Sequence, residues 1–77
     1  MEIDIETKIE RWKIKAELFL KNNTQCFIKT INRDYHSADI LVIGEDTILI
    51  YDFIKQQKFK VYWVDITLFC EYVESGE

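Results

Sequence analysis

Residues 38–53 read ADILVIGEDTILIYDF, and the architecture of the whole chain follows from them. Two runs rich in β-branched and aromatic residues flank residues 44–47 (Gly-Glu-Asp-Thr), whose composition is typical of a hairpin turn. Gly44 is one of only two glycines in the chain, so we expect this turn to use a positive φ angle at Gly44. The stretch therefore predicts a central antiparallel pair of strands over residues 38–43 and 47–53.

The length and the cysteine content limit how this chain can be stabilised. Its 77 residues are expected to form one domain, close to the lower size limit for a self-sufficient hydrophobic core. Cys26 and Cys70 belong to no CxxC motif and to no His/Cys cluster, so we expect no zinc and no other cofactor. The N-terminus has no signal-peptide pattern, so we predict a cytoplasmic protein with two buried free thiols in preference to a Cys26–Cys70 disulfide. Self-association is then the expected source of additional stability.

The formal net charge of −4 is unevenly distributed along the chain. Residues 1–23 are neutral, residues 24–70 carry a net charge of −1, and Glu71, Glu74 and Glu77 supply the remaining −3. An acidic chain disfavours nucleic acid as a partner, but a nearly neutral body leaves room for a local basic surface. No apolar run approaches the roughly 20 residues of a membrane-spanning helix, so we expect no membrane partner.

Residues 4–22 have the pattern of an amphipathic helix. Apolar side chains recur at the spacing that places them on one helix face, namely Ile5, Ile9, Trp12, Ala16, Phe19 and Leu20. Thr7 and Asp4 are competing N-caps, acids gather early and lysines late, and Asn22-Asn23 fits a C-terminal stop. The alternating apolar residues from Trp12 to Leu20 also fit a strand, but the strong helix formers and the charge asymmetry favour the helix.

Ile14 and Leu18 lie on the opposite face of this expected helix. Two interpretations remain open. They are isolated exposed apolar residues, which are common on protein surfaces, or they form a second stripe that contacts another subunit or lies across a sheet edge. We name Ile14 and Leu18 as predicted oligomer contacts because so small a domain has reason to associate.

The rest of the chain has the pattern of short strands joined by polar connections. Strands are predicted over residues 26–32 and 59–66, the second of which continues or bends into residues 67–72. Residues 33–37 are expected to form a loop, and residues 73–77 a frayed tail.

One N-terminal helix followed by four to five consecutive short strands predicts the α+β class, mainly β. We expect the helix, 4–22, to pack on a small, strongly bent antiparallel barrel, 26–72, because closure removes the exposed edges of so short a sheet. The predicted core consists of apolar residues that share one face of the helix or of a strand: Ile9, Trp12, Ala16, Phe19, Ile40, Val42, Ile48, Ile50, Val61 and Trp63. If the facing of one strand is misjudged, the alternating neighbours of its residues take their place.

The order and length of these elements resemble the Sm-like (LSm) small β-barrels, which are themselves SH3-like. Residues 39–52 look like the first signature of that family, two apolar strands around an acidic turn, with Thr47 nearest to its usual Asn. Residues 62–66 (Tyr-Trp-Val-Asp-Ile) fall where the family has its short second signature, without its Arg-Gly or Lys-His pair. The resemblance implies homo-oligomeric rings that bind uridine- or adenine-rich RNA in these turns. Other SH3-like modules, such as Tudor-like or translation-associated barrels, are a close alternative.

The best candidate for a nucleic-acid site in this sequence is a group of three lysines followed by a tyrosine: Lys55, Lys58, Lys60 and Tyr62. Lysines can contact the phosphates of a single strand while an aromatic ring stacks on a base. Alternation along the strand places Phe59 on the core face and Tyr62 on the other, so Tyr62 is the predicted stacking residue. The alternative to a nucleic-acid site is a solvated basic loop beside core aromatic residues, with no binding function.

Arg33 and Tyr35 form a second basic–aromatic pair and complete the predicted RNA-binding set. We therefore predict a non-catalytic RNA-binding or RNA-scaffolding module that acts as a homo-oligomer. The alternative is a protein-interaction module that uses the helix or an open strand edge and binds no nucleic acid.

His36 is the only histidine, and we interpret it as a solvated loop residue because neither a nucleophile nor a pocket is evident near it. Asp39, Asp52 and Asp65 fall within or at the ends of the expected strands and are interpreted as ordinary edge or turn acids. The sequence therefore predicts that the protein is not an enzyme, and catalysis at His36 is the weakest of the three hypotheses.

Overall fold

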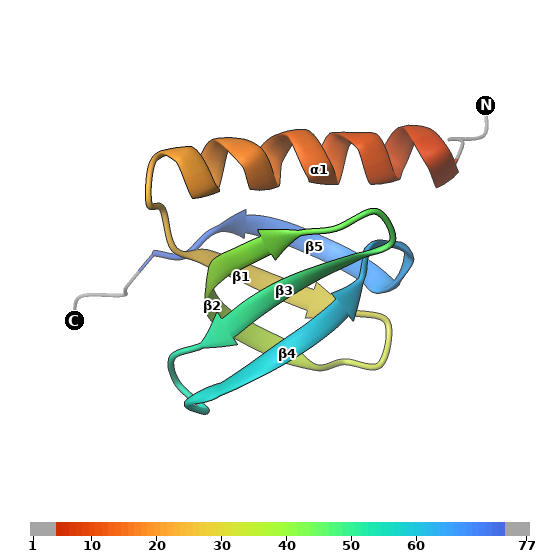
Figure 1. Ribbon diagram of the computed structural model, residues 1–77. Helices are drawn as coiled ribbons and strands as arrows, with labels where there is room; N and C mark the ends of the chain where they lie inside the picture. Colours follow the sequence, from red (N-terminus) through yellow and green to blue (C-terminus); the bar gives the residue numbers. More distant parts are fainter. Residues whose placement is uncertain (1–4, 74–77) are drawn as a thin grey trace.

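The computed structural model describes residues 5–73 and contains one long helix and five strands. In chain order the elements are α1 (Ile5–Lys21), β1 (Cys26–Thr30), β2 (Tyr35–Ile43), β3 (Thr47–Asp52), β4 (Gln57–Tyr62), the short 3₁₀ helix η1 (Trp63–Asp65) and β5 (Ile66–Glu71) (Figure 1). The predicted helix and central strand pair are confirmed. The possible N-cap Asp4 and the tail residues 74–77 lie outside the described residues.

The five strands form one antiparallel sheet in the order β4-β3-β2-β1-β5. The predicted α+β class, with an N-terminal helix and antiparallel strands, is confirmed. Within residues 5–73, β4 and β5 each pair with a single neighbour, so the sheet is not closed into the expected barrel. Figure 1 shows β3 and β4 in front of β1 and β5, with α1 lying along one end of the curved sheet.

The helix α1 packs through one apolar face, as its residue spacing predicts. Ala16 is fully buried, and the half-buried Trp12 and Phe19 pack against the core. Both rings meet Phe69 of β5 edge-on, at centroid distances of 5.9 Å for Trp12 and 5.5 Å for Phe19. The helix ends as expected, because Asn23 adopts a left-handed conformation with φ of 54°.

The core is formed by alternate residues of all five strands together with the helix face. Its buried apolar members are Ala16, Cys26, Ile28, Ala38, Ile40, Ile48, Ile50, Val61, Trp63, Ile66 and Phe69. Six of the predicted core residues are in this set, and Ile9, Trp12 and Phe19 pack against it half-buried.

The prediction that Val42 belongs to the core is wrong. Ile40 pairs with Ile50 across the hairpin, but Val42 pairs with Leu49, so one additional residue is accommodated in β2. Such a bulge reverses the facing of the residues beyond it. Val42 is consequently 54% exposed, and Ile43 packs against the core in its place.

The expected positive φ at Gly44 is also wrong, because Gly44 has no positive φ. A glycine is required at this position because the backbone of Thr47 approaches it closely. The N–H of Gly44 donates to the carbonyl oxygen of Thr47 at 2.8 Å, and a Cβ on Gly44 would lie only 2.8 Å from that same oxygen. The carbonyl of Gly44 in turn accepts a hydrogen bond from Trp63 Nε1 at 3.1 Å.

Trp63 also explains why the long strand predicted over residues 59–66 is divided. Its backbone N–H donates to the carbonyl of Asp46 at 3.1 Å, and its indole is fully buried. The chain therefore turns through η1 at Trp63 and enters β5 on the far edge of the sheet. The loop predicted over residues 33–37 is shorter than expected, because β2 already begins at Tyr35.

Cys26 and Cys70 are free thiols, as predicted, although Cys70 is only half-buried. They lie on adjacent strands, but Cys26 pairs with Glu71 and Cys70 pairs with Phe27. Opposed residues share a face of a sheet, so the two thiols point to opposite faces and cannot form a disulfide in this register. Burial, with the charges of Asp39 and Cys70 nearby, raises the pKa of Cys26 to about 12, which makes it an unreactive core thiol.

A matched pair of truncations tests the bulge in β2. We expect Ile40→Ala to lower the free energy of unfolding by about 2–5 kcal/mol because it removes buried methyl groups. Val42→Ala should change it by less than about 1 kcal/mol, since Val42 faces solvent. Urea denaturation measures both values. Equal losses for the two variants would contradict the bulge.

Candidate functional site

The carboxylate of Asp52 organises the turn between β3 and β4. It is buried at 1% exposure, and its Oδ1 accepts hydrogen bonds from the N–H groups of Ile54 at 3.0 Å and Lys55 at 2.8 Å. This Asx-type arrangement bends the chain directly after β3. The turn continues with Gln56, which adopts a left-handed φ of 59° and donates its N–H to the carbonyl of Asp52.

The second carboxylate oxygen of Asp52 contacts His36, and the interpretation of His36 as a solvated loop residue is wrong. His36 lies within β2, is 5% exposed, and its Nδ1 is 3.0 Å from Asp52 Oδ2. Its ring packs 4.6 Å from the ring of Phe59 in β4. The pair therefore joins β2 to the end of β3 beneath the edge strand.

The protonation of Asp52 follows from these contacts. Burial alone raises the pKa of Asp52, but hydrogen bonds from the Lys55 N–H, from His36 and from the Ile54 N–H, together with the charge of Lys55, lower its pKa below the ordinary value. An ionised carboxylate can only accept hydrogen bonds, so Nδ1 of His36 carries the proton. Among the described residues, Nε2 of His36 has no hydrogen-bond partner.

A cavity of about 230 Å³ is lined in part by His36, and we call it the His36 cavity. Its lining consists of His36, Lys55 and four consecutive residues of β4 on one side, and of the β1–β2 turn and η1 on the other: Thr30, Asn32, Asp34, His36, Lys55, Phe59, Lys60, Val61, Tyr62 and Asp65. The turn is linked to η1 by a hydrogen bond from the Ile31 N–H to the Asp65 carbonyl at 2.9 Å. The cavity thus lies between the edge strand β4 and the β1–β2 turn.

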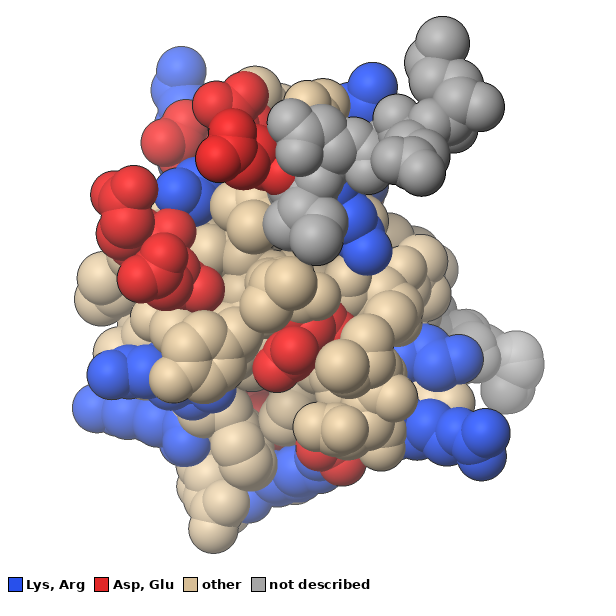
Figure 2. Space-filling model, turned by 90° about the vertical axis from the view of Figure 1, so that its right-hand side faces the viewer, with Lys and Arg blue, Asp and Glu red and all other residues tan. Residues whose placement is uncertain are grey.

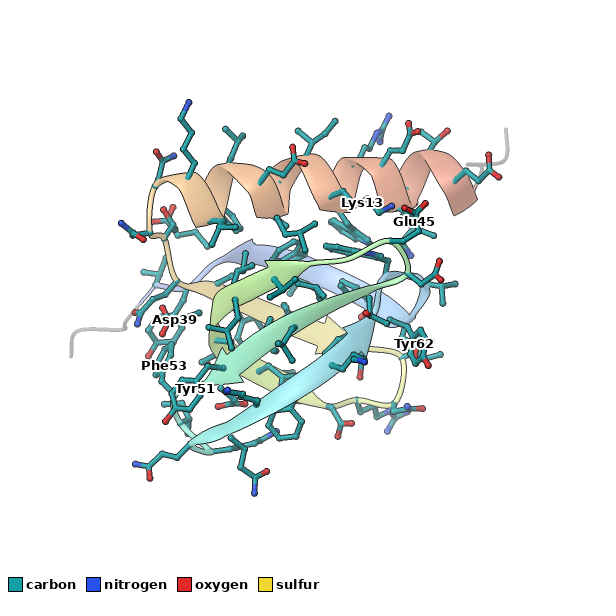
Figure 3. The ribbon with its side chains drawn as sticks, in the orientation of Figure 1. Lys13, Asp39, Glu45, Tyr51, Phe53 and Tyr62 are labelled. Atoms are coloured by element: carbon teal, nitrogen blue, oxygen red, sulfur yellow. The ribbon has the colours of Figure 1, made fainter. Side chains whose placement is uncertain are left out.

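The His36 cavity has mixed charge and one exposed ring at its rim. Lys55 and Lys60 contribute cations, whereas Asp34 and Asp65 contribute carboxylates. Figure 2 shows this end of the molecule. Acidic side chains gather toward α1, and separate groups of Lys and Arg lie below them, on either side of further acidic atoms. Tyr62 is 53% exposed, as alternation predicts, and Figure 3 shows it on the same end of the sheet.

The structure separates the six predicted RNA-binding residues. Lys55, Lys60 and Tyr62 line the His36 cavity. Lys58 pairs with Tyr51 and is not in the lining, and Tyr35 instead stacks on Phe27 with Lys29 over its ring.

Of the remaining predicted cations, Arg33 lies in the β1–β2 turn, and the ammonium group of Lys55 is already engaged in contacts within the protein. Arg33 occupies the left-handed position of the β1–β2 turn, with φ of 67°. Lys55 Nζ donates to the carbonyl of Tyr35 at 2.9 Å, lies 3.9 Å from Asp52 Oδ2, and is 5.4 Å from the centre of the Phe59 ring. Lys60 is therefore the cavity lysine most available for a phosphate.

The sequence interpretation missed His36, Phe59 and the turn residues Asn32 and Asp34 as cavity residues. A signal for the buried pair was present, because the alternation of Ala38 and Ile40 extends backward to His36. The same alternation of Ile48 and Ile50 extends forward to Asp52.

The predicted oligomer contacts Ile14 and Leu18 are exposed on α1, at 60% and 54%. Within residues 5–73, no group of three or more His, Cys, Asp and Glu side chains is placed to bind a metal ion. In the described part of the chain, no helix is both long and apolar enough to cross a membrane. No family model and no curated protein sequence matches the chain.

The lowered pKa of Asp52 predicts how stability depends on pH. The ionised carboxylate stabilises the fold above the ordinary Asp pKa of about 3.9, and this contribution is lost as the pH falls through the lowered pKa of the folded state. We expect Asp52→Asn to lower the free energy of unfolding by about 1–3 kcal/mol at neutral pH. The variant should also lose less stability than the parent between about pH 5 and about pH 2.

Chemical denaturation across this pH range provides the measurement, and Asp34→Asn is the matched control. Asp34 lies at the same cavity but is exposed. The account is contradicted if Asp52→Asn has the same stability and the same acid sensitivity as the parent.

Proposed function

We propose that this chain is a non-catalytic RNA-binding module that takes an unstacked base of single-stranded RNA at the His36 cavity. One observation carries the proposal. Lys60 and Tyr62, predicted from the sequence as phosphate-binding and stacking residues, lie at a single cavity together with the rings of His36 and Phe59.

The size and chemistry of the cavity favour one base over a larger ligand. Its volume of about 230 Å³ is below the roughly 300–1,000 Å³ of sites for drug-sized molecules. Sequence-specific proteins read single-stranded RNA by stacking splayed bases on aromatic rings and by hydrogen bonds to their edges. Tyr62 supplies an exposed ring, and Asn32, Asp34 and His36 Nε2 supply donors and acceptors for base edges.

The architecture supports an assignment to the Sm-like or SH3-like small β-barrels, which is part of the same proposal. An N-terminal helix followed by consecutive antiparallel strands is the order of elements that the resemblance implies, and the structure has this order. In this proposal the curved sheet is a partly open barrel, and subunits associate through the unpaired edges of β4 and β5. Ring assembly would then multiply a modest affinity per subunit.

The second candidate is a protein-interaction module that binds no nucleic acid. The observation in its favour is the exposed apolar pair Ile14 and Leu18 on the outer face of α1. This candidate predicts that a protein or a second copy of the chain covers α1, and that changes at Tyr62 have no effect on binding.

Binding of short oligouridine and oligoadenine, followed by fluorescence anisotropy across a salt series, tests the proposal. We expect Tyr62→Ala to weaken binding by about 1–3 kcal/mol because a stacking ring is lost. Lys60→Ala should reduce the slope of log K against log salt by about 0.7, the value for one phosphate contact on a single strand. Lys21→Ala, at the far end of α1, is the control and should change neither quantity. Absence of binding at low salt would refute the proposal.

Light scattering tests the proposed assembly separately. We expect a mass that is a multiple of 9.3 kDa, and we expect Ile14→Ser with Leu18→Ser to reduce it if α1 contributes to the contact. A stable 9.3 kDa monomer at high micromolar concentration is the contrary result.

A further inference from the structure

A second group of aromatic side chains lies on the side of the sheet that faces away from the core. We call this surface the outer aromatic face and define it by the rings of Phe27, Tyr35, Tyr51, Phe53 and Tyr72. Phe27 and Tyr51 alternate with buried residues of β1 and β3, and Tyr35 precedes the buried His36 in β2. Figure 3 shows Tyr51 and Phe53 together with Asp39 at one side of the sheet, at the opposite end from Tyr62.

Four of these rings contact one another in two pairs, and all five remain accessible. Phe53 meets Tyr72 edge-on at a centroid distance of 5.2 Å, and Phe27 lies 5.8 Å from Tyr35 with an angle of 30° between the rings. Tyr35 is exposed and the other four are only half-buried. Outward positions of a solvent-facing sheet are ordinarily polar, so an aromatic group here indicates a binding surface.

The charged residues around the outer aromatic face are mainly positive, although the net charge of the chain is negative. Lys29 lies 5.6 Å from the centre of the Tyr35 ring, and Lys58 is the cross-strand partner of Tyr51. Lys60 follows two residues further along β4 and shares its outward side. Asp39 is the cross-strand partner of Tyr51 on its other side and is the acid among these outward positions. Among the outward positions of the described strands, three lysines and one acid thus lie around these rings in a chain of net charge −4, and this arrangement complements a polyanion.

We propose that the outer aromatic face is a stacking surface for single-stranded RNA, distinct from the His36 cavity. The inference rests on the proposed RNA-binding function and extends it to a second contact area. Aromatic residues on an open sheet surface stack successive bases in known modes of RNA recognition, and every base has a π-face that such rings accept. Lys29 and Lys58 contact the phosphates between the stacked bases.

The edge strand β4 connects the two surfaces. Lys60 lines the His36 cavity, whereas Lys58, on the same outward row, neighbours Tyr51. A strand with one base in the cavity passes over β4 along these lysines and reaches Tyr51. A protein partner would instead have to bury Asp39 and the lysines, and each would need a compensating charge.

Comparison of a uridine trinucleotide with a uridine dodecanucleotide tests this inference by fluorescence anisotropy. Only the longer RNA can occupy both surfaces. We expect Tyr51→Leu, which keeps apolar bulk but removes the ring, to weaken binding of the dodecanucleotide by about 5- to 150-fold. Binding of the trinucleotide should be unchanged. Tyr51→Phe, which retains the ring, should bind both RNAs like the parent protein.

The salt dependence provides a second measurement. Lys58→Ala should reduce the salt slope for the dodecanucleotide by about 0.7 and leave the slope for the trinucleotide unchanged. A thermal melt of each variant shows whether it is folded, and Lys58→Ala at an exposed position preserves the test if Tyr51→Leu does not fold.

The possible failures are distinguishable. If Tyr62→Ala weakens both RNAs while Tyr51→Leu and Lys58→Ala bind the dodecanucleotide like the parent, the outer aromatic face is refuted and the His36 cavity remains. If neither RNA binds the parent protein, the RNA-binding function itself fails. If Tyr51→Leu changes the mass of the assembly but not RNA binding, the face is a protein contact and the inference is overturned.

Discussion

The buried carboxylate of Asp52 is the constraint on which the β3–β4 turn and the neighbouring start of β2 depend. A charge at 1% exposure is tolerated only when hydrogen bonds replace its water, and three bonds from Ile54, Lys55 and His36 do so. The two backbone bonds from Ile54 and Lys55 position the β3–β4 turn, and the bond from His36 positions the histidine of β2. Two residues of the cavity lining, His36 and Lys55, are therefore held in place by satisfying one buried charge.

The packing of the β2–β3 turn depends on the contacts of Trp63 in η1. Its indole N–H donates to Gly44 and its backbone N–H to Asp46, so the β2–β3 turn and η1 pack against each other. This turn sends β5 to the far edge beside β1, so that within residues 5–73 no strand pairs with the outer side of β4. The unpaired side of β4 borders the cavity, and its outward lysines lead to the outer aromatic face. In the proposed assembly the open edge of β4, an aggregation hazard in most sheets, pairs with another subunit, and the outward side chains of β4 remain available to RNA.

Local patterns in the sequence were sufficient for the helix, for the central hairpin and for the exposure of Tyr62, because each depends on periodicity within a few residues. The bulge at β2 was not predictable in this way, since the exposure of Val42 depends on how Leu49 pairs across the hairpin. The His36–Asp52 contact joins residues 16 positions apart, and no local rule identifies such a partner. The separation of Lys58 from the other predicted RNA-binding residues at the His36 cavity likewise required the sheet register, which places Lys58 beside Tyr51.

Titration of the ¹⁵N-labelled protein with oligouridine, followed by two-dimensional NMR, tests the central claim most directly. The account predicts that the backbone amides of Asn32, Lys60 and Tyr62 and the ring nitrogens of His36 shift together, over the same range of RNA concentration. These groups come from β2, β4 and the β1–β2 turn, and the His36 cavity is what they share. Shifts confined to α1 around Ile14 and Leu18, or no shifts at low salt, would contradict it.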